Sequence, residues 1–302
     1  PLSELEVKAE LLYNRIPFSK ILFMINLSLG VLSFMLLLHN SLQRNTPSPK
    51  AKTISRTAGT IFSVALYLAF IFHLAGYCLR WYIGGRVPLS NGYETMQFMA
   101  LCILLIACLL HRRFSFILPF GFLLSGFALL VSYLGQMNPQ ITPLMPVLVS
   151  PWLSIHVSLI MMSYALLAFI MLNGILALCL RKKESENNVS GNDAVQDNRI
   201  EQLTLVSRLL LYPATFFLGA GIFLGAVWAN VSWGRYWAWD PKEVWALITF
   251  LVYGVAFHSQ SLRIFRKPLF FHIYMILAFL TVLMTYFGVN YVLGGMHSYA
   301  NS

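Results

Sequence analysis

The stretch LSIHVSLIMMSYALLAFIMLNGILALCL, residues 153–180, contains no Asp, Glu, Lys or Arg. A helix can cross the hydrocarbon core of a bilayer when about 20 consecutive residues are predominantly apolar, so this stretch predicts a transmembrane helix. Other apolar stretches predict further spanning helices at about 20–39, 60–83, 93–110, 114–134, 208–229, 243–262 and 270–293. We therefore expect an all-α fold, a polytopic transmembrane helix bundle of about eight spanning helices.

The composition of the whole chain agrees with this class of protein. Of its 302 residues, 58% are hydrophobic and only 11% are charged, which is too apolar for a soluble domain. The net charge of +10 does not indicate a nucleic-acid-binding protein, because the basic residues form short clusters beside the apolar stretches. Such clusters are typical signals of membrane topology.

The basic clusters also predict the orientation of the bundle. With both termini outside, the inner loops collect most of the basic residues: Arg44, Lys50, Lys52, Arg56, Arg112, Arg113, Arg181, Lys182, Lys183, Arg199, Arg208, Arg263, Arg266 and Lys267. We divide the chain into residues 1–59 and residues 60–302. The first part holds an outward N-terminal segment, the first spanning helix and an inner loop, and the second is the main membrane domain.

The cysteines exclude several kinds of site. The chain has four, and none of them forms a C-x-x-C pair. Disulfide frameworks and zinc sites are therefore not expected. The sequence also lacks C-x-x-C-H, the usual motif for covalent attachment of c-type haem, so thiols for such a bond must come from a partner.

The most informative segment is WANVSWGRYWAWDPKEVW, residues 228–245, which we call the tryptophan segment and expect to be an outer loop. It holds five of the chain's seven tryptophans. An aromatic belt at the membrane surface is the simple alternative, but belts place one or two such residues at a helix end. Flat indole rings beside a short loop suit a large planar apolar ligand, of which porphyrin is the obvious biological example.

The end of the tryptophan segment predicts the start of a helix. Asp240-Pro-Lys-Glu243 reads as an N-cap, a proline at the first helical position and a capping-box glutamate. The positive end of that helix favours an anionic group such as a porphyrin propionate, although Asp240 as a cap would occupy the same amides. Arg235 and Lys242 are further candidate partners for a propionate.

The chain has seven histidines, and their positions sort them into three groups. His39, His111 and His272 lie at predicted inner helix ends, where we expect interfacial side chains. His156 and His297 flank the tryptophan segment in sequence and share its predicted outer side. His73 and His258 lie within apolar helices, where an ionisable residue is costly and indicates a function. A structural histidine that donates to a backbone carbonyl is the alternative for this last pair.

The run Trp233 to Trp245 resembles the tryptophan-rich signature of the haem-handling cytochrome c assembly family. Within that family the chain is most similar to the CcsA-type (ResC) component of the system II cytochrome c synthase. The resemblance extends from about Thr60 onward and includes the stretches LRWY, residues 79–82, and SNGYE, residues 90–94.

This resemblance implies a function and a site. A member of the family holds haem b non-covalently and presents it, outside the bacterial inner membrane, for thioether attachment to the C-x-x-C-H segment of apocytochrome c. It acts as a component of a cytochrome c synthase with a CcsB-type (ResB) subunit, separate or fused upstream. By resemblance, the axial ligands of the external haem, and so the catalytic residues, are His156 and His297, and the ligands of a haem in transit are His73 and His258. The expected haem contacts are Trp233, Arg235, Trp237, Trp239, Asp240 and Trp245.

Three other functions remain open at this point. Both histidine pairs could hold permanent haems in a quinol-linked transmembrane electron-transfer protein. The chain could instead transport another planar aromatic molecule, or act as a scaffold for a catalytic subunit. Exchange of the bound haem would argue against the electron-transfer protein. A purified protein without haem would favour the transporter. If this chain by itself failed to retain haem, the scaffold would be favoured.

Overall fold

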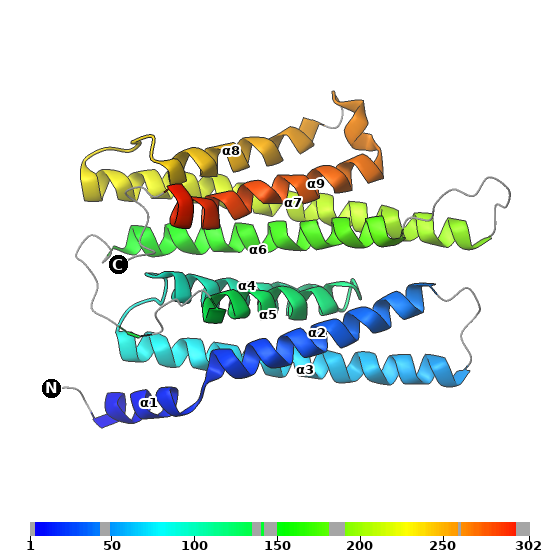
Figure 1. The fold of residues 1–302 in the computed structure, drawn as a ribbon, viewed down its shortest axis with the longest axis horizontal. Helices are drawn as coiled ribbons and strands as arrows, with labels where there is room; N and C mark the ends of the chain where they lie inside the picture. Colours follow the sequence, from blue (N-terminus) through cyan, green and yellow to red (C-terminus); the bar gives the residue numbers. More distant parts are fainter. Residues whose placement is uncertain are drawn as a thin grey trace. The chain divides into compact units, whose positions relative to one another are not determined.

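The computed structural model describes residues 4–42, 49–134, 140–141, 150–180, 191–258 and 261–293, and all regular elements within these ranges are helices (Figure 1). Six helical segments in this part of the chain are long and apolar enough to cross a membrane, and Ile117–Tyr133 is a shorter apolar helix. The expected all-helical, polytopic membrane bundle is confirmed.

Each predicted span lies largely within a helix, although the helices at 49–84 and 191–233 begin 11 and 17 residues before the predicted starts. The bounds of the helices are α1 Glu4–Arg15, α2 Phe18–Leu42, α3 Pro49–Gly84, α4 Gly92–Leu110, α5 Ile117–Leu134, α6 Pro151–Leu180, α7 Gly191–Trp233, α8 Pro241–Val255 and α9 Pro268–Leu283. Helix α1 was not predicted, because it has no buried residues and is too polar to give an apolar signal. An exposed ion pair one turn apart, Glu4 to Lys8 at 2.6 Å, lies on its surface.

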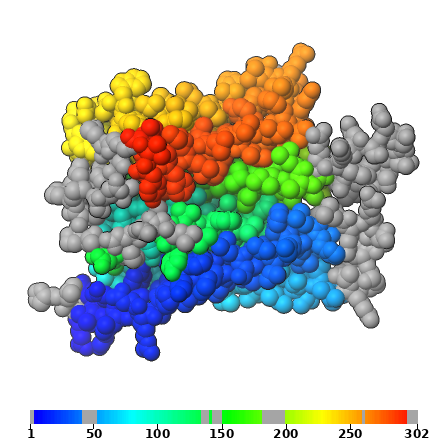
Figure 2. All heavy atoms as spheres, in the orientation of Figure 1, coloured from blue at the N-terminus to red at the C-terminus, as the bar shows by residue number. Residues whose placement is uncertain are grey.

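The chain divides into two compact units, residues 1–161 and residues 162–302. In the first unit, α5 packs against α2 and α4, and α2 also lies against α3 in a continuous surface of side chains (Figure 2). Helices α2 and α5 approach closely because each has a glycine at the contact. A Cβ atom on Gly30 would lie 2.9 Å from the backbone nitrogen of Leu123, and one on Gly126 would lie 2.9 Å from that of Leu27. Small residues of this kind commonly let membrane helices meet at backbone distance.

In the second unit, buried polar side chains link α6, α7 and α9. Asn173 donates to the hydroxyl of Ser207 at 3.1 Å, and His272 Nε2 lies 2.9 Å from the hydroxyl of Thr204. His272 is fully buried and His111, in the first unit, is nearly so. The prediction that these two histidines are interfacial was therefore wrong, because each is enclosed by neighbouring helices and bonded to them or to its own backbone.

Two predicted spans have irregular ends. Helix α8 ends at Val255 and continues as a 3-10 turn, Ala256–His258, so residues 243–262 do not form one regular helix. Helix α9, which lies beside α8 (Figure 1), widens into a π-helix, Met284–Leu293 (η4). π-Helical turns are rare and occur often at functional sites.

Candidate ligand-binding site around the tryptophan segment

The tryptophan segment begins in a helix and not in a loop. Helix α7 ends at Trp233, and Gly234 follows with a φ of 73° and donates its N–H to the carbonyl of Asn230 at 2.8 Å. A glycine takes this left-handed conformation without steric cost and closes the helix. The expected outer loop 228–245 is therefore shorter, because only residues 234–240 lie outside helices.

The predicted capping box is confirmed at the start of α8. The Asp240 carboxylate accepts the N–H of Lys242 at 3.0 Å, and Glu243 Oε2 accepts the N–H groups of Ala238 at 2.8 Å and Asp240 at 3.2 Å. These carboxylates satisfy backbone donors at the helix end and fix the path of the loop. Asp240 is buried in this role, so the structure assigns it to shaping the loop.

Trp239 is the most unusual residue of the segment. Its φ of 58° puts a bulky residue in the left-handed region, and its side chain is 74% exposed. Left-handed backbone costs a non-glycine residue about 1–2 kcal/mol, and strain of this kind gathers at functional sites. The fold thus holds an exposed indole in a costly conformation, which is a reason to look for a ligand here.

The other rings of the segment differ in burial. The indoles of Trp237 and Trp239 meet edge to face at a centroid distance of 6.0 Å, and those of Trp228 and Trp233 do so at 4.8 Å. Trp228 is buried and anchors the end of α7, whereas Trp233, Trp237 and Trp245 are half-buried. The segment therefore presents an apolar aromatic surface, which the buried Trp228 fixes to the end of α7.

Two basic side chains belong to the segment. Arg235 is exposed on the loop. Lys242 lies at the start of α8, and its Nζ donates to Asn290 Oδ1 in η4 at 2.9 Å. Burial lowers the pKa of the Lys242 amine to about 8, and the nearby carboxylate of Asp240 partly opposes that shift.

The histidines on the predicted outer side are only partly described. His156 is half-buried in the second turn of α6 and belongs to the first unit, whereas the tryptophan segment belongs to the second. His297 lies outside the described residues. The chain leaves η4 at Leu293, four residues before His297, and Asn290 ties η4 to Lys242. Joint ligation by His156 and His297 stays a prediction.

The inner pair has two different environments. His73 is almost fully buried in α3, and its Nε2 lies 2.8 Å from the carbonyl oxygen of Gln97 in α4. A carbonyl only accepts, so Nε2 carries the proton and donates it. This hydrogen bond is the one expected of a structural histidine that donates to a backbone carbonyl, the alternative given for His73 in the sequence analysis. His258 lies in the 3-10 turn after α8 and its side chain is exposed, so the prediction that it sits within an apolar helix was wrong.

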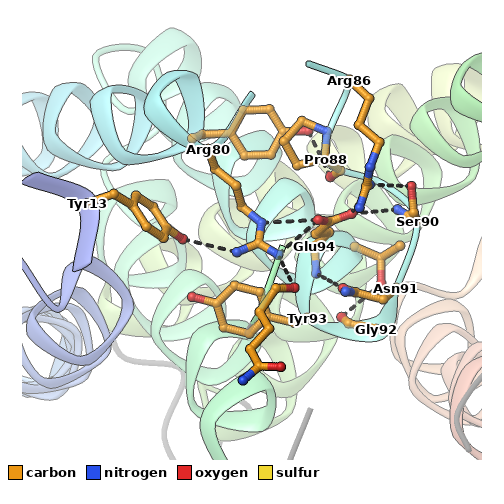
Figure 3. Close-up of polar contacts among 12 residues, drawn as sticks. Tyr13, Arg80, Arg86, Pro88, Ser90, Asn91, Gly92, Tyr93 and Glu94 are labelled. Atoms are coloured by element: carbon orange, nitrogen blue, oxygen red, sulfur yellow. Dashed lines mark hydrogen bonds and ion pairs between the residues drawn. The ribbon is translucent and has the colours of Figure 1, made fainter. Parts of the chain in front are cut away.

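A buried ion cluster at the α3–α4 connection was not predicted. Figure 3 shows Arg80, Arg86 and Ser90 around the carboxylate of Glu94. Glu94 Oε1 accepts from Arg80 Nε at 3.1 Å and Nη2 at 2.9 Å, while Oε2 accepts from Arg86 Nη1 at 3.1 Å and Ser90 N at 2.8 Å. Arg80 also lies over the ring of Tyr93, 5.0 Å from its centroid. The cluster covers both stretches, 79–82 and 90–94, that carried part of the resemblance.

Comparisons with known proteins agree on one family. The model of a family described as cytochrome C assembly protein matches residues 89–297, a range that includes the tryptophan segment, His156, His258 and His297 but begins after His73. NrfI of Wolinella succinogenes is 36% identical over 99% of this chain and 32% of its own length. CcsA of Chlamydomonas reinhardtii is 38% identical over 73% of the chain and 63% of its own length, and CcsA of Guillardia theta is 34% identical over 73% and 79%. The chain thus spans about a third of NrfI and under two thirds of the Chlamydomonas protein.

Proposed function

Because the chain belongs to the cytochrome c assembly protein family, we propose that its tryptophan segment holds haem b non-covalently and presents it to apocytochrome c. Each cysteine thiol of the C-x-x-C-H segment then adds across a vinyl group of the haem. Sulfur bonds to one vinyl carbon and the proton goes to the other, so the addition itself needs no oxidant. The chain's own contribution is binding and orientation of the haem.

The conformation of Trp239 is the observation that carries this proposal. An exposed indole in a left-handed backbone costs free energy in the unliganded chain, and a flat apolar ligand laid against it would recover part of that cost. The neighbouring ring of Trp237 extends the apolar face. The capping box holds both rings at the start of α8.

The proposed haem site also needs protein ligands for the iron. We assign the axial positions to His156 and His297, which would bind the iron from opposite faces. Support comes from the bond between Lys242 and Asn290, since it brings a residue seven positions before His297 to the start of α8. Arg235, exposed on the loop, would pair with a propionate.

We further propose that haem passes between His73 and His258 on its way to the outer site. For Nε2 of His73 to bind iron, the imidazole must give up its hydrogen bond to the Gln97 carbonyl, a loss of about 1 kcal/mol. The exposure of His258 leaves that side chain accessible to a ligand.

Membership of the family supports a setting for the reaction. We propose that the haem site faces the periplasm from the bacterial inner membrane, with lipid around the bundle, and that the chain is a cytochrome c synthase component needing a CcsB-type (ResB) partner. The length of NrfI, of which this chain spans about a third, leaves room for such a part in a fused protein.

Assembly of holocytochrome c tests the proposal. The full chain with its partner is co-expressed with an apocytochrome c, and covalently bound haem is measured on denaturing gels for wild type, His156→Ala, His297→Ala and Trp239→Ala. His39→Ala, which changes an exposed histidine at a predicted inner helix end, is the matched control. We expect each of the three site variants, but not the control, to lose most of the covalent haem. Full assembly by all three site variants would overturn the proposal, and permanently bound haem without assembly would favour the electron-transfer alternative.

A further inference from the structure

Helix α8 and the π-helix η4 are joined by side-chain hydrogen bonds at two levels. The hydroxyls of Thr249 and Thr285 lie 3.0 Å apart, and Lys242 Nζ donates to Asn290 Oδ1 at 2.9 Å. Moving from the first bond to the second goes back along α8 and forward along η4, so the two elements run antiparallel. The Lys242–Asn290 bond is the one nearer the tryptophan segment and nearer the end of η4.

Joining two helices through the Lys242–Asn290 bond costs free energy. A long, flexible lysine side chain is held in one conformation, and its ammonium is taken largely out of water. Burial lowers its pKa to about 8, the direction expected for an ammonium removed from water. Apolar side chains would join the two helices with a smaller loss of free energy. Where proteins retain a buried polar group in spite of this loss, its best-known role is to fix the register of helices.

The register of α8 and η4 matters because Asn290 lies close to the end of η4. Asn290 lies in the last turn of η4, which ends at Leu293, and His297 follows four residues later. The Lys242–Asn290 bond therefore ties the last turn of η4 to the start of α8. Lys242 immediately follows the Asp240-Pro241 start of α8, to which the loop with Trp239 is fastened by the capping box.

We propose that Lys242 and Asn290 are positioning residues that fix where the segment bearing His297 leaves the bundle relative to the tryptophan segment. This inference rests on the proposed function, in which His297 binds the iron of a haem lying on that segment. The pair acts through His297, and neither residue needs to touch the iron.

The spin state of bound haem tests this inference. The full chain is purified with haem as wild type, Asn290→Leu, Asn290→Asp and Thr285→Val, and the low-spin fraction is measured by absorption and electron paramagnetic resonance. Asn290→Leu should raise the ratio of unligated to ligated haem roughly tenfold, the effect of losing one hydrogen bond with a charged donor. Added imidazole should restore the low-spin spectrum. Asn290→Asp keeps an acceptor for Lys242 and should match wild type.

Thr285→Val is the matched control, because it removes the Thr249–Thr285 hydrogen bond between the same two helices. A wild-type spectrum for Asn290→Leu would overturn the inference. Equal losses in Asn290→Leu and Thr285→Val would also overturn it, since general packing of α8 on η4 would then explain both.

A haem-free measurement separates this inference from the proposed function. Nitroxide labels on Tyr236→Cys and His297→Cys, in a background without the four native cysteines, report the distance between the tryptophan segment and position 297. Asn290→Leu should broaden that distance distribution and Thr285→Val should not. If wild type bound no haem, the proposed function would fail, while the distances would still support or overturn the positioning role.

Discussion

Replacing Glu94 by Gln should destabilise the first unit more than most single substitutions. Glu94 and Arg80 have side chains only 1% and 2% exposed, and the carboxylate accepts from both Arg80 and Arg86 (Figure 3). An amide at position 94 is neutral and offers one oxygen in place of two, so the Arg80 guanidinium loses its buried counter-charge. Breaking a buried ion pair in this way costs about 3–5 kcal/mol.

The assay for this prediction is reversible unfolding in detergent, followed by helix content against denaturant. Glu4→Gln is the control, because it breaks a pair of 2.6 Å whose side chains are 83% and 66% exposed, and it should cost no more than about 0.5 kcal/mol. The double variant Arg80→Met/Glu94→Leu removes both charges and should be more stable than Glu94→Gln. A loss below about 1 kcal/mol for Glu94→Gln, or a double variant less stable than the single one, would refute the reasoning.

Three further predictions address the site and the packing. Trp239→Gly should leave the unliganded chain as stable or up to about 1 kcal/mol more stable, because glycine relieves the left-handed backbone, while haem binding in a titration falls. Lys242 has a folded pKa of about 8 against an ordinary 10.5, so the unfolded chain binds more protons between those values. Stability should therefore rise by about 3 kcal/mol as pH increases from 8 to 10.5, and Lys242→Met should lose this dependence in denaturant titrations. Gly30→Ala, whose Cβ would meet Leu123, should lower the unfolding midpoint, whereas Gly59→Ala, with nothing within 4 Å, should not.

Much of the fold could be predicted from the sequence, because lipid allows only segments that satisfy their own backbone hydrogen bonds. The long apolar runs therefore marked the spans, and the capping box at Asp240 and Glu243 marked the start of α8 to the residue. The placement of His258 failed because the apolar pattern continues beyond Val255, where the α-helix has already ended.

Side-chain partners were the least predictable part of the candidate site. Arg80 and Glu94 meet only because the turn between α3 and α4 brings two helix ends together, although opposite charges at neighbouring helix ends were a signal that could have been read. Lys242 was predicted to pair with a propionate, but its acceptor in the structure is Asn290. A π-helix has no sequence pattern that separates it from an α-helix, so neither η4 nor its contacts could be foreseen.

The most direct test of the haem assignment is the absorption spectrum of the full chain purified from haem-replete cells, beside the double variant His156→Ala/His297→Ala. Wild type should carry haem with the sharp bands of a low-spin, bis-imidazole iron, and the double variant should lose those bands and bind less haem. Identical spectra and identical haem content in the two proteins would contradict ligation by these histidines.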